Sequence, residues 1–221
     1  MRTGIFVTGT DTNVGKTVVA AALFHRYRGR CPLRYWKPIQ TGIERDDDTG
    51  EVQRLTGCDE TELLRAGERL PRPVSPHLAA RCAGRRIDLG ELTTLMDAHA
   101  GAARWIVEGA GGVLVPVNES DTMADLMRHV ALPAVVVARS TLGTINHTLL
   151  TLEALRARGV TVAGVAMVGE KNPDNRAAIE QYGRARILAE MPIFDQLTAA
   201  RLSEWALVEC DPELRLLEFL S

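Results

Sequence analysis

Residues 6–19 read FVTGTDTNVGKTVV, and this stretch sets the expected fold. Gly15-Lys16-Thr17 is the usual end of a loop that binds phosphate, but five residues separate Gly9 from Gly15 where the standard spacing has four. The surroundings are nevertheless right, because an apolar strand is expected at 4–8 and a helix at 16–28. Backbone N–H groups at a helix start, the Lys16 charge and the Thr17 hydroxyl suit phosphate and magnesium. We therefore interpret the stretch as a phosphate-binding loop; a plain strand-to-helix turn is the alternative.

Short apolar runs alternate with longer amphipathic runs along the rest of the chain. Five runs predict strands, several of them buried on both faces: 5–7, 33–36, 105–107, 134–137 and 162–166. Five others have apolar residues at three- and four-residue intervals and predict helices: 18–27, 89–99, 124–130, 144–158 and 176–188. This alternation predicts an α/β fold with a mostly parallel sheet and helices on both faces, whose ligands gather at the carboxyl ends of the strands.

The overall composition is that of an ordinary globular enzyme. The 221 residues are 46% hydrophobic and 24% charged, with a formal net charge of −2. We expect one domain spanning 1–221, with 42–70 as a mobile active-site loop containing one short helix. The balanced charge argues against nucleic acid, and no apolar stretch approaches the roughly 20 residues that span a bilayer. Without a cleavable signal and with four widely spaced cysteines, the chain is expected to be cytoplasmic, with reduced thiols.

Five segments between residue 6 and about 155 have a recognisable pattern. They are 6–17, Lys37-Pro38-Ile39-Gln40-Thr41-Gly42, Ser75-Pro76-His77, Val107-Glu108-Gly109-Ala110-Gly111-Gly112 and Leu142-Gly143-Thr144-Ile145-Asn146-His147. In this order they resemble the dethiobiotin synthetase family, a group of P-loop enzymes in which the five-residue gap is normal. Similarity beyond 170 is expected to be thin.

The resemblance implies a ligase of biotin biosynthesis that closes the ureido ring of dethiobiotin. Its substrates would be 7,8-diaminononanoate, CO2 (or bicarbonate) and ATP as the nucleoside triphosphate, with Mg2+ as the metal. One amine would take up CO2, the resulting carbamate would attack the γ-phosphate to form a carbamic-phosphoric anhydride, and the second amine would close the ring. ADP and phosphate would be released. A homodimer is also implied by the resemblance.

Two lysines and three oxygen-bearing residues are the candidate catalytic and metal-binding groups. Charge accumulates on the carbamate and the transferring phosphoryl group, which requires cations, and Lys16 and Lys37 suit that requirement. Lys37 follows a strand, where it can be brought over the phosphates; a solvated lysine is the alternative. Magnesium prefers hard oxygen ligands, for which we select Thr17, Glu108 and Asp48. Within the acidic run the family resemblance favours Asp48, with Asp47 as the reserve.

The remaining candidates would bind the nucleotide and the diamine. The nucleotide set joins the phosphate loop to backbone at two later turns, and its members are Thr12, Asn13, Val14, Gly15, Lys16, Thr17, Gly169, Pro192, Ile193 and Phe194. The substrate set comprises Thr10, Thr41, Gly111, Gly112, Leu142, Gly143, Thr144 and Asn146. The last four open the helix 144–158, whose N–H groups would receive the substrate carboxylate in a partner subunit. Tyr182 is left open, and His77 is taken as structural.

Base recognition is where the sequence departs from the family. Many members place an Asn for adenine directly after the strand that corresponds to 162–167, but here Val168-Gly169-Glu170-Lys171 follows, and Asn172 and Asn175 are displaced. Nucleotide selectivity is therefore expected to be weak.

Two other functions fit a phosphate-binding loop. One is an ATPase switch of the partitioning or nitrogenase-iron-protein type, although such loops usually have an additional Lys that 9–14 lacks. The other is an ATP-dependent amidation enzyme, which usually adds a glutaminase domain for which 221 residues leave no room. Neither alternative accounts for all five segments.

Overall fold

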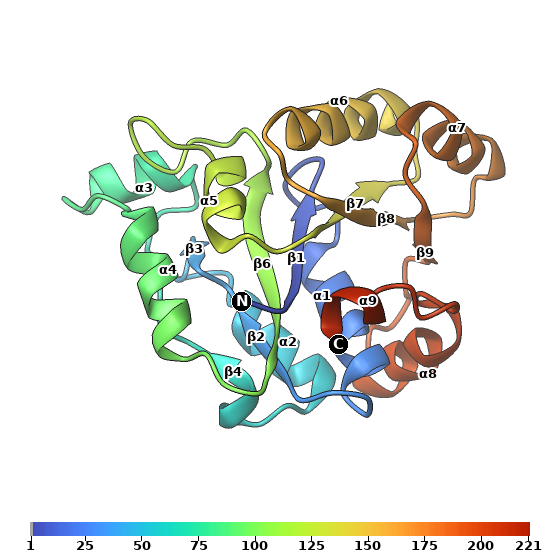
Figure 1. Ribbon diagram of the computed structural model, residues 1–221, viewed down its shortest axis with the longest axis horizontal. Coiled ribbons are helices and arrows are strands. Elements are labelled where there is room, and N and C mark those ends of the chain that lie inside the picture. Colours follow the sequence, from blue (N-terminus) through green and yellow to red (C-terminus); the bar gives the residue numbers. More distant parts are fainter. Residues whose placement is uncertain (1) are drawn as a thin grey trace.

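A computed structural model describes residues 2–221. Seven strands form one sheet in the order β4-β2-β6-β1-β7-β8-β9, and each neighbouring pair is parallel (Figure 1). The strands are β1 (Gly4–Gly9), β2 (Leu33–Trp36), β4 (Leu63–Leu64), β6 (Arg104–Gly112), β7 (Ala134–Arg139), β8 (Val162–Val168) and β9 (Ile187–Met191). The α/β fold class and the five strands predicted from apolar runs are confirmed.

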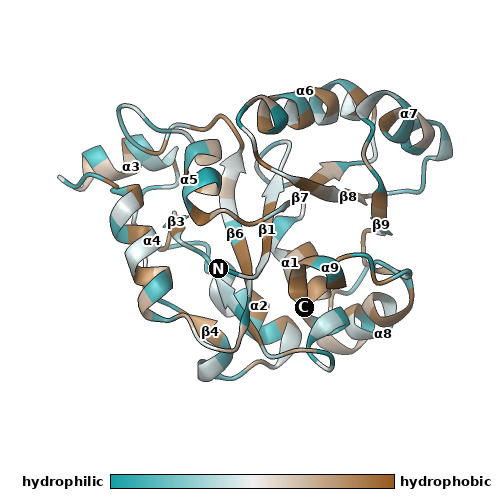
Figure 2. Cartoon of the chain, viewed as in Figure 1, coloured by the Kyte–Doolittle hydropathy of each residue, from teal (hydrophilic) through white to brown (hydrophobic). Residues whose placement is uncertain are grey.

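Helices cover both faces of this sheet, because alternate residues of each strand point to opposite sides. On one face Ile5 and Val7 of β1 pack with α1 (Lys16–Tyr27), α2 (Asp48–Thr56), α8 (Ala199–Glu209) and α9 (Leu217–Leu220). On the other, Phe6 packs among residues of α3 (Pro76–Cys82), α4 (Leu89–Ala98), α5 (Met123–Val130), α6 (Thr144–Ala157) and α7 (Pro173–Gly183). Figure 2 shows apolar colour concentrated on β7–β9, with polar colour on the outer helices.

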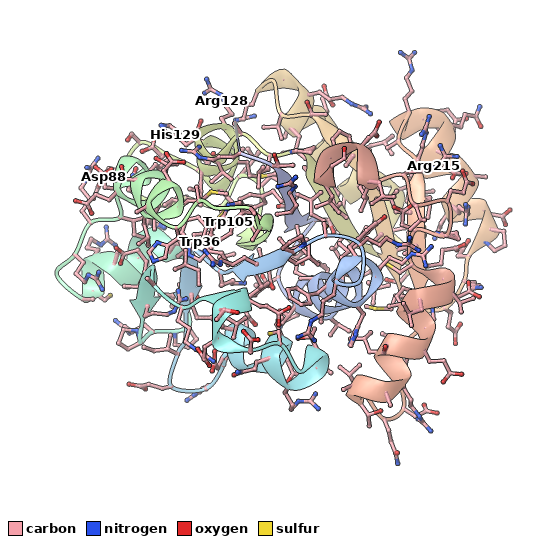
Figure 3. All side chains as sticks on the ribbon, turned by 60° about the horizontal axis from the view of Figure 1, so that its bottom comes forward. Trp36, Asp88, Trp105, Arg128, His129 and Arg215 are labelled. Atoms are coloured by element: carbon pink, nitrogen blue, oxygen red, sulfur yellow. The ribbon has the colours of Figure 1, made fainter. Side chains whose placement is uncertain are left out.

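Two tryptophans join neighbouring strands within the second of these layers. Trp36 of β2 and Trp105 of β6 have ring centroids 6.1 Å apart at a tilted angle, and Figure 3 shows their side chains next to each other. The Trp36 indole also donates a 2.8 Å hydrogen bond to the Ala66 carbonyl. The contact supports the pairing of β2 with β6, which matters for the site because Lys37 follows β2 and Glu108 lies within β6.

The expected helix at 176–188 is wrong in its second half. Helix α7 ends at Gly183, after which Arg184 adopts a left-handed conformation (φ 45°) that stops the helix. The chain then enters β9, which pairs with β8. The apolar spacing of 176–188 therefore spans a helix end and a buried edge strand.

The expectation of a loop at 42–70 is also wrong, although the one short helix predicted there is present as α2. The segment contains α2, a 3₁₀ turn (Glu60–Glu62), β4 and β5 (Glu68–Leu70), and β5 pairs with β3 (Ile39–Thr41) in a separate two-stranded sheet. The Asp47 side chain caps α2 at the Gly50 N–H, and Asp59 forms a capping box with Glu62. These acidic residues are local caps, which is why a charged stretch is ordered here.

Candidate active site

The phosphate-binding loop lies between the end of β1 and the start of α1. Its additional residue is absorbed by two left-handed positions, Asn13 (φ 53°) and Gly15 (φ 97°), which Asn and Gly adopt more readily than other residues. Lys16 Nζ donates to the Asp11 carbonyl at 2.7 Å. In the described residues no side chain caps the α1 N-terminus, where Gly15 is the N-cap, so its first N–H groups remain available to an anion.

A cluster of charges stands directly above this helix start. Lys37 Nζ lies 2.6 Å from Asp48 Oδ2 and 2.7 Å from Glu108 Oε1, and it also donates to the Gly109 carbonyl at 3.0 Å. The Thr17 hydroxyl lies 3.1 Å from Asp48 Oδ1 and 3.0 Å from Glu108 Oε1. Lys37 is only 3% exposed, so the alternative of a solvated lysine is wrong.

Strand register explains how residues distant in sequence meet here. Trp36 pairs with Val107, so Lys37 and Glu108 follow side by side at the carboxyl edge, toward which the β1 and β6 arrowheads point in Figure 1. Asp48 is the first residue of α2, while its neighbour Asp47 is occupied as the cap of that helix. The structure thus brings Asp48 into the cluster and leaves Asp47 outside it.

The two lysines experience opposite electrostatic environments. Burial alone would lower the pKa of Lys37, but Glu108 and Asp48 outweigh it and raise this pKa, so Lys37 stays a cation. Burial, together with repulsion from Lys37, lowers the pKa of Lys16 to about 8. Burial opposes ionisation of Asp48, yet Lys37, Thr17 and Lys16 hold the pKa of this carboxyl below its usual value. Lys16 is thus the group whose charge responds to pH near neutrality.

Tyr35 was not among the predicted site residues. Its hydroxyl donates to Glu108 Oε2 at 2.8 Å, and the side chain is completely buried. Burial and the adjacent Glu108 raise the pKa of this phenol well above its ordinary value, so it remains a neutral donor. The sequence signal was the spacing: Tyr35 precedes Lys37 by two residues on the same side of an extended segment.

The oxygen atoms of Thr17, Asp48 and Glu108 fit a magnesium site. The Thr17 hydroxyl lies within 3.1 Å of one oxygen of each carboxylate. Hydroxyl and carboxylate oxygens are the hard ligands that magnesium takes beside phosphates and water. Across residues 2–221, no three His, Cys, Asp or Glu side chains gather as a metal site, so this set depends on the Thr17 hydroxyl. All four cysteines carry free thiols.

Two adjacent clefts receive most of the predicted ligand-binding residues. The first, of about 360 Å³, is lined by polar groups that include Thr12, Lys16, Lys37, Thr41 and Gly111. The second, of about 450 Å³, is mostly apolar, and Val14, Gly169, Pro192, Ile193 and Phe194 line it. Asn13 and Gly15 border both clefts. A triphosphate in the first cleft would therefore point its base toward the second.

Arg139 is a second residue that the sequence did not indicate. It lines the apolar cleft, and its guanidinium donates to the Thr12 carbonyl at 3.1 Å, which ties the end of β7 to the phosphate loop. Thr10 and Gly112 lie at the same edge, since Gly9 pairs with Gly112.

The start of α6 lies outside both clefts. Leu142, Gly143 and Asn146 are exposed at the surface, whereas Thr144 is buried with its hydroxyl 3.5 Å from that of Thr148. Neither cleft lining includes these four residues. Tyr182 is two-thirds exposed on α7. Ser75 Oγ and His77 Nδ1 lie 3.1 Å apart at the start of α3.

The parallel sheet, the loop at its carboxyl edge and the uncapped helix that follows define a P-loop nucleotide-binding protein. A family model described as an AAA domain matches residues 3–201. The ATP-dependent dethiobiotin synthetase of Paramagnetospirillum magneticum is 50% identical over 200 residues, which cover 90% of this chain and 93% of that protein. Its counterpart in Rhodopseudomonas palustris is 46% identical over 91% and 92% of the two chains. The chain belongs to the dethiobiotin synthetase family.

This membership confirms the family, the ligase class, the ATP dependence and the biotin-pathway function that the five segments predicted. The family match extends to residue 201 and so includes part of the chain beyond residue 170.

Solved structures at low sequence identity share the fold. A ParA family ATPase from Chlorobium tepidum aligns with a TM-score of 0.60 at 11% identity, covering 93% of this chain and 98% of its own. The MinC:MinD cell division complex from Aquifex aeolicus gives 0.58 at 13% identity, covering 92% and 86%. At such identities the likeness concerns the fold alone.

Proposed function

We propose that this chain makes dethiobiotin from 7,8-diaminononanoate, CO2 and ATP at the cleft between Lys16 and Lys37. One amine of the substrate takes up CO2 as a carbamate. A carbamate oxygen attacks the γ-phosphorus and ADP leaves; the second amine then attacks the carbamoyl carbon and phosphate leaves. The observation that carries this proposal is the convergence of two lysines, a threonine and two carboxylates above the phosphate loop in a member of this family.

The two lysines would divide the work of stabilising negative charge. Lys37, buried and held as a cation by Asp48 and Glu108, faces the position where charge grows during phosphoryl transfer. Lys16 would leave the Asp11 carbonyl and donate to phosphate oxygens instead. Thr41 and Gly111 line the same cleft and would contact the carbamate or the diamine.

Thr17, Asp48 and Glu108 would hold magnesium. When bound, the metal would supply positive charge that offsets the negative charge of the transferring phosphoryl group. Lys37, in contact with both carboxylates, would help to hold Asp48 and Glu108 in place for it.

The finer parts of the proposal concern assembly and location. We propose a single domain that acts as a homodimer in the cytoplasm, the start of α6 in one subunit receiving the substrate carboxylate bound to its partner. Support comes from Leu142, which is completely exposed beside that helix start. Residues 2–221 contain no helix whose length and apolar character would allow it to cross a membrane.

One incubation tests the function. The protein is mixed with 7,8-diaminononanoate, bicarbonate, Mg2+ and ATP, and dethiobiotin is sought by mass spectrometry. The ureido product with ADP and phosphate is the expected result. Phosphate release without the diamine, and no ureido product with it, would instead favour the ATPase switch.

A further inference from the structure

Tyr35 places a hydroxyl among mainly apolar side chains. The side chain is buried among residues of the α1–α2 face of the sheet, including Leu55, Leu63 and Ile106. A phenylalanine would fill the same space without a hydroxyl to desolvate. The polar atom therefore matters through its one partner, Glu108 Oε2 at 2.8 Å.

We propose that Tyr35 is a positioning residue for Glu108 and so sets the affinity of the magnesium site. Its phenol engages Oε2 on the buried side, which leaves Oε1 to face Thr17 at 3.0 Å and Lys37 at 2.7 Å. The inference rests on the proposed function, because it assumes that Glu108 is a metal ligand.

Tyr35 can affect metal binding because the two oxygens of the Glu108 carboxylate have different partners. Glu108 is 1% exposed, so an oxygen that loses its donor cannot recover one from water. Lys37 is the nearest mobile donor and would then bridge both oxygens, which turns Oε1 away from Thr17. A group that holds a metal-binding carboxylate in this way typically changes metal affinity by 10- to 100-fold when it is removed.

A matched control exists elsewhere in the chain. Tyr27 is also completely buried, and its hydroxyl donates to the carboxylate of Asp211, which is 1% exposed. That pair belongs to α1 and the turn after α8, and neither residue lines the two clefts at the site. Tyr27→Phe therefore removes an equivalent buried hydrogen bond without touching Glu108.

The experiment measures Mn2+ affinity by electron paramagnetic resonance in the presence of saturating ADP, for the wild-type protein, Tyr35→Phe and Tyr27→Phe. Tyr35→Phe is expected to weaken Mn2+ binding about tenfold, and Tyr27→Phe to leave it within about twofold of wild type. Melting curves are recorded for each protein. Unchanged Mn2+ affinity in folded Tyr35→Phe, or equal weakening in both variants, would overturn the proposal.

A second comparison covers the case in which Tyr35→Phe folds poorly. Glu108→Gln removes the buried charge, so Tyr35→Phe can be added in that background. If Tyr35 acts through Glu108, the addition changes Mn2+ affinity less than about twofold, whereas a further tenfold loss would contradict the proposal. Mn2+ binding requires no dethiobiotin formation. Selective weakening in Tyr35→Phe would therefore support the positioning role even if the synthetase assay failed.

Discussion

Replacing Lys37 with Gln should reduce both stability and turnover, and the two effects can be separated. Lys37 is the only side chain that contacts Asp48 and Glu108 together through a positive charge within the described residues. The substitution keeps most of the side-chain volume but leaves two carboxylates facing each other, one of them 1% exposed.

The expected magnitudes follow from this arrangement. Removing one partner of a buried ion pair costs about 3–5 kcal/mol, and the lower end applies because Asp48 retains some contact with solvent. In a chain of this size, about 3 kcal/mol corresponds to a melting temperature lower by roughly 6–12 °C. Loss of one preorganised donor to a growing charge lowers turnover by about two to three powers of ten.

Magnesium distinguishes the two effects. A divalent cation between the carboxylates replaces the missing positive charge, so Mg2+ with ADP should recover much of the melting temperature of Lys37→Gln. It should not recover kcat, because the donor to the transferring group is still absent. Dethiobiotin formation is followed by mass spectrometry at saturating substrates, alongside thermal melts. Wild-type turnover with a wild-type melting curve would remove Lys37 from the site.

Three further outcomes are expected. Because the pKa of Lys16 is lowered to about 8, the free protein loses this cation as pH rises through 8. Affinity for a non-hydrolysable ATP analogue should therefore fall about tenfold per pH unit above pH 8. Constant affinity up to pH 9.5 would contradict the lowered pKa of Lys16. Glu108→Gln and Asp48→Asn should each raise the Mg2+ concentration for half-maximal activity, and a larger effect of Asp47→Asn would transfer the ligand role to that residue. At least one other nucleoside triphosphate should support the reaction with kcat/KM within about tenfold of ATP; a thousandfold preference for ATP would reveal a specific base reader.

Weak selectivity for the nucleotide base is expected because the second cleft, toward which the base would point, is mostly apolar. The two asparagines displaced from the family position have local structural partners: Asn172 caps α7 at the Asn175 N–H, and the Asn175 amide donates to the Ser140 carbonyl at 2.9 Å. Phe194, whose ring lies edge-on to Trp205 with 6.3 Å between the ring centroids, lines the apolar cleft and offers no polar atom that would distinguish one base from another. The triphosphate is the same in every nucleotide, so contacts with it cannot distinguish ATP from the other nucleoside triphosphates.

Sequence reasoning selected some site residues from their local position, and the structure brings three of these residues together. Lys37 directly follows β2, Glu108 lies within β6 beside it, and Thr17 stands at the start of α1. All three lie toward the carboxyl ends of the strands, where parallel sheets bind ligands. Their mutual contact depends on β2 lying beside β6, and that strand order cannot be obtained from either strand alone. The family resemblance supplied what local patterns could not.

Tyr35, in contrast, was not selected from the sequence. A tyrosine within an apolar strand is typical of a core position. Its two-residue spacing from Lys37 places it on the same side of the extended segment but does not identify its partner. Its polar partner, Glu108, is 73 positions away in the chain. Only the register between two strands brings the phenol to the carboxylate, so the role becomes visible once tertiary structure is known.

The unusual loop spacing has a geometric explanation that also joins the two clefts. A spacing rule describes one backbone path between a strand and the Gly-Lys pair, and a longer path serves equally well if it returns the chain to the same helix start. Asn13 and Gly15 provide that return through their left-handed conformations. A side chain at Gly15 would meet Val168, whose Cγ atoms would lie 3.3 Å from its Cβ, and Val168 lines the apolar cleft. The same glycine therefore lets the loop turn and lets it approach the wall against which the base would lie.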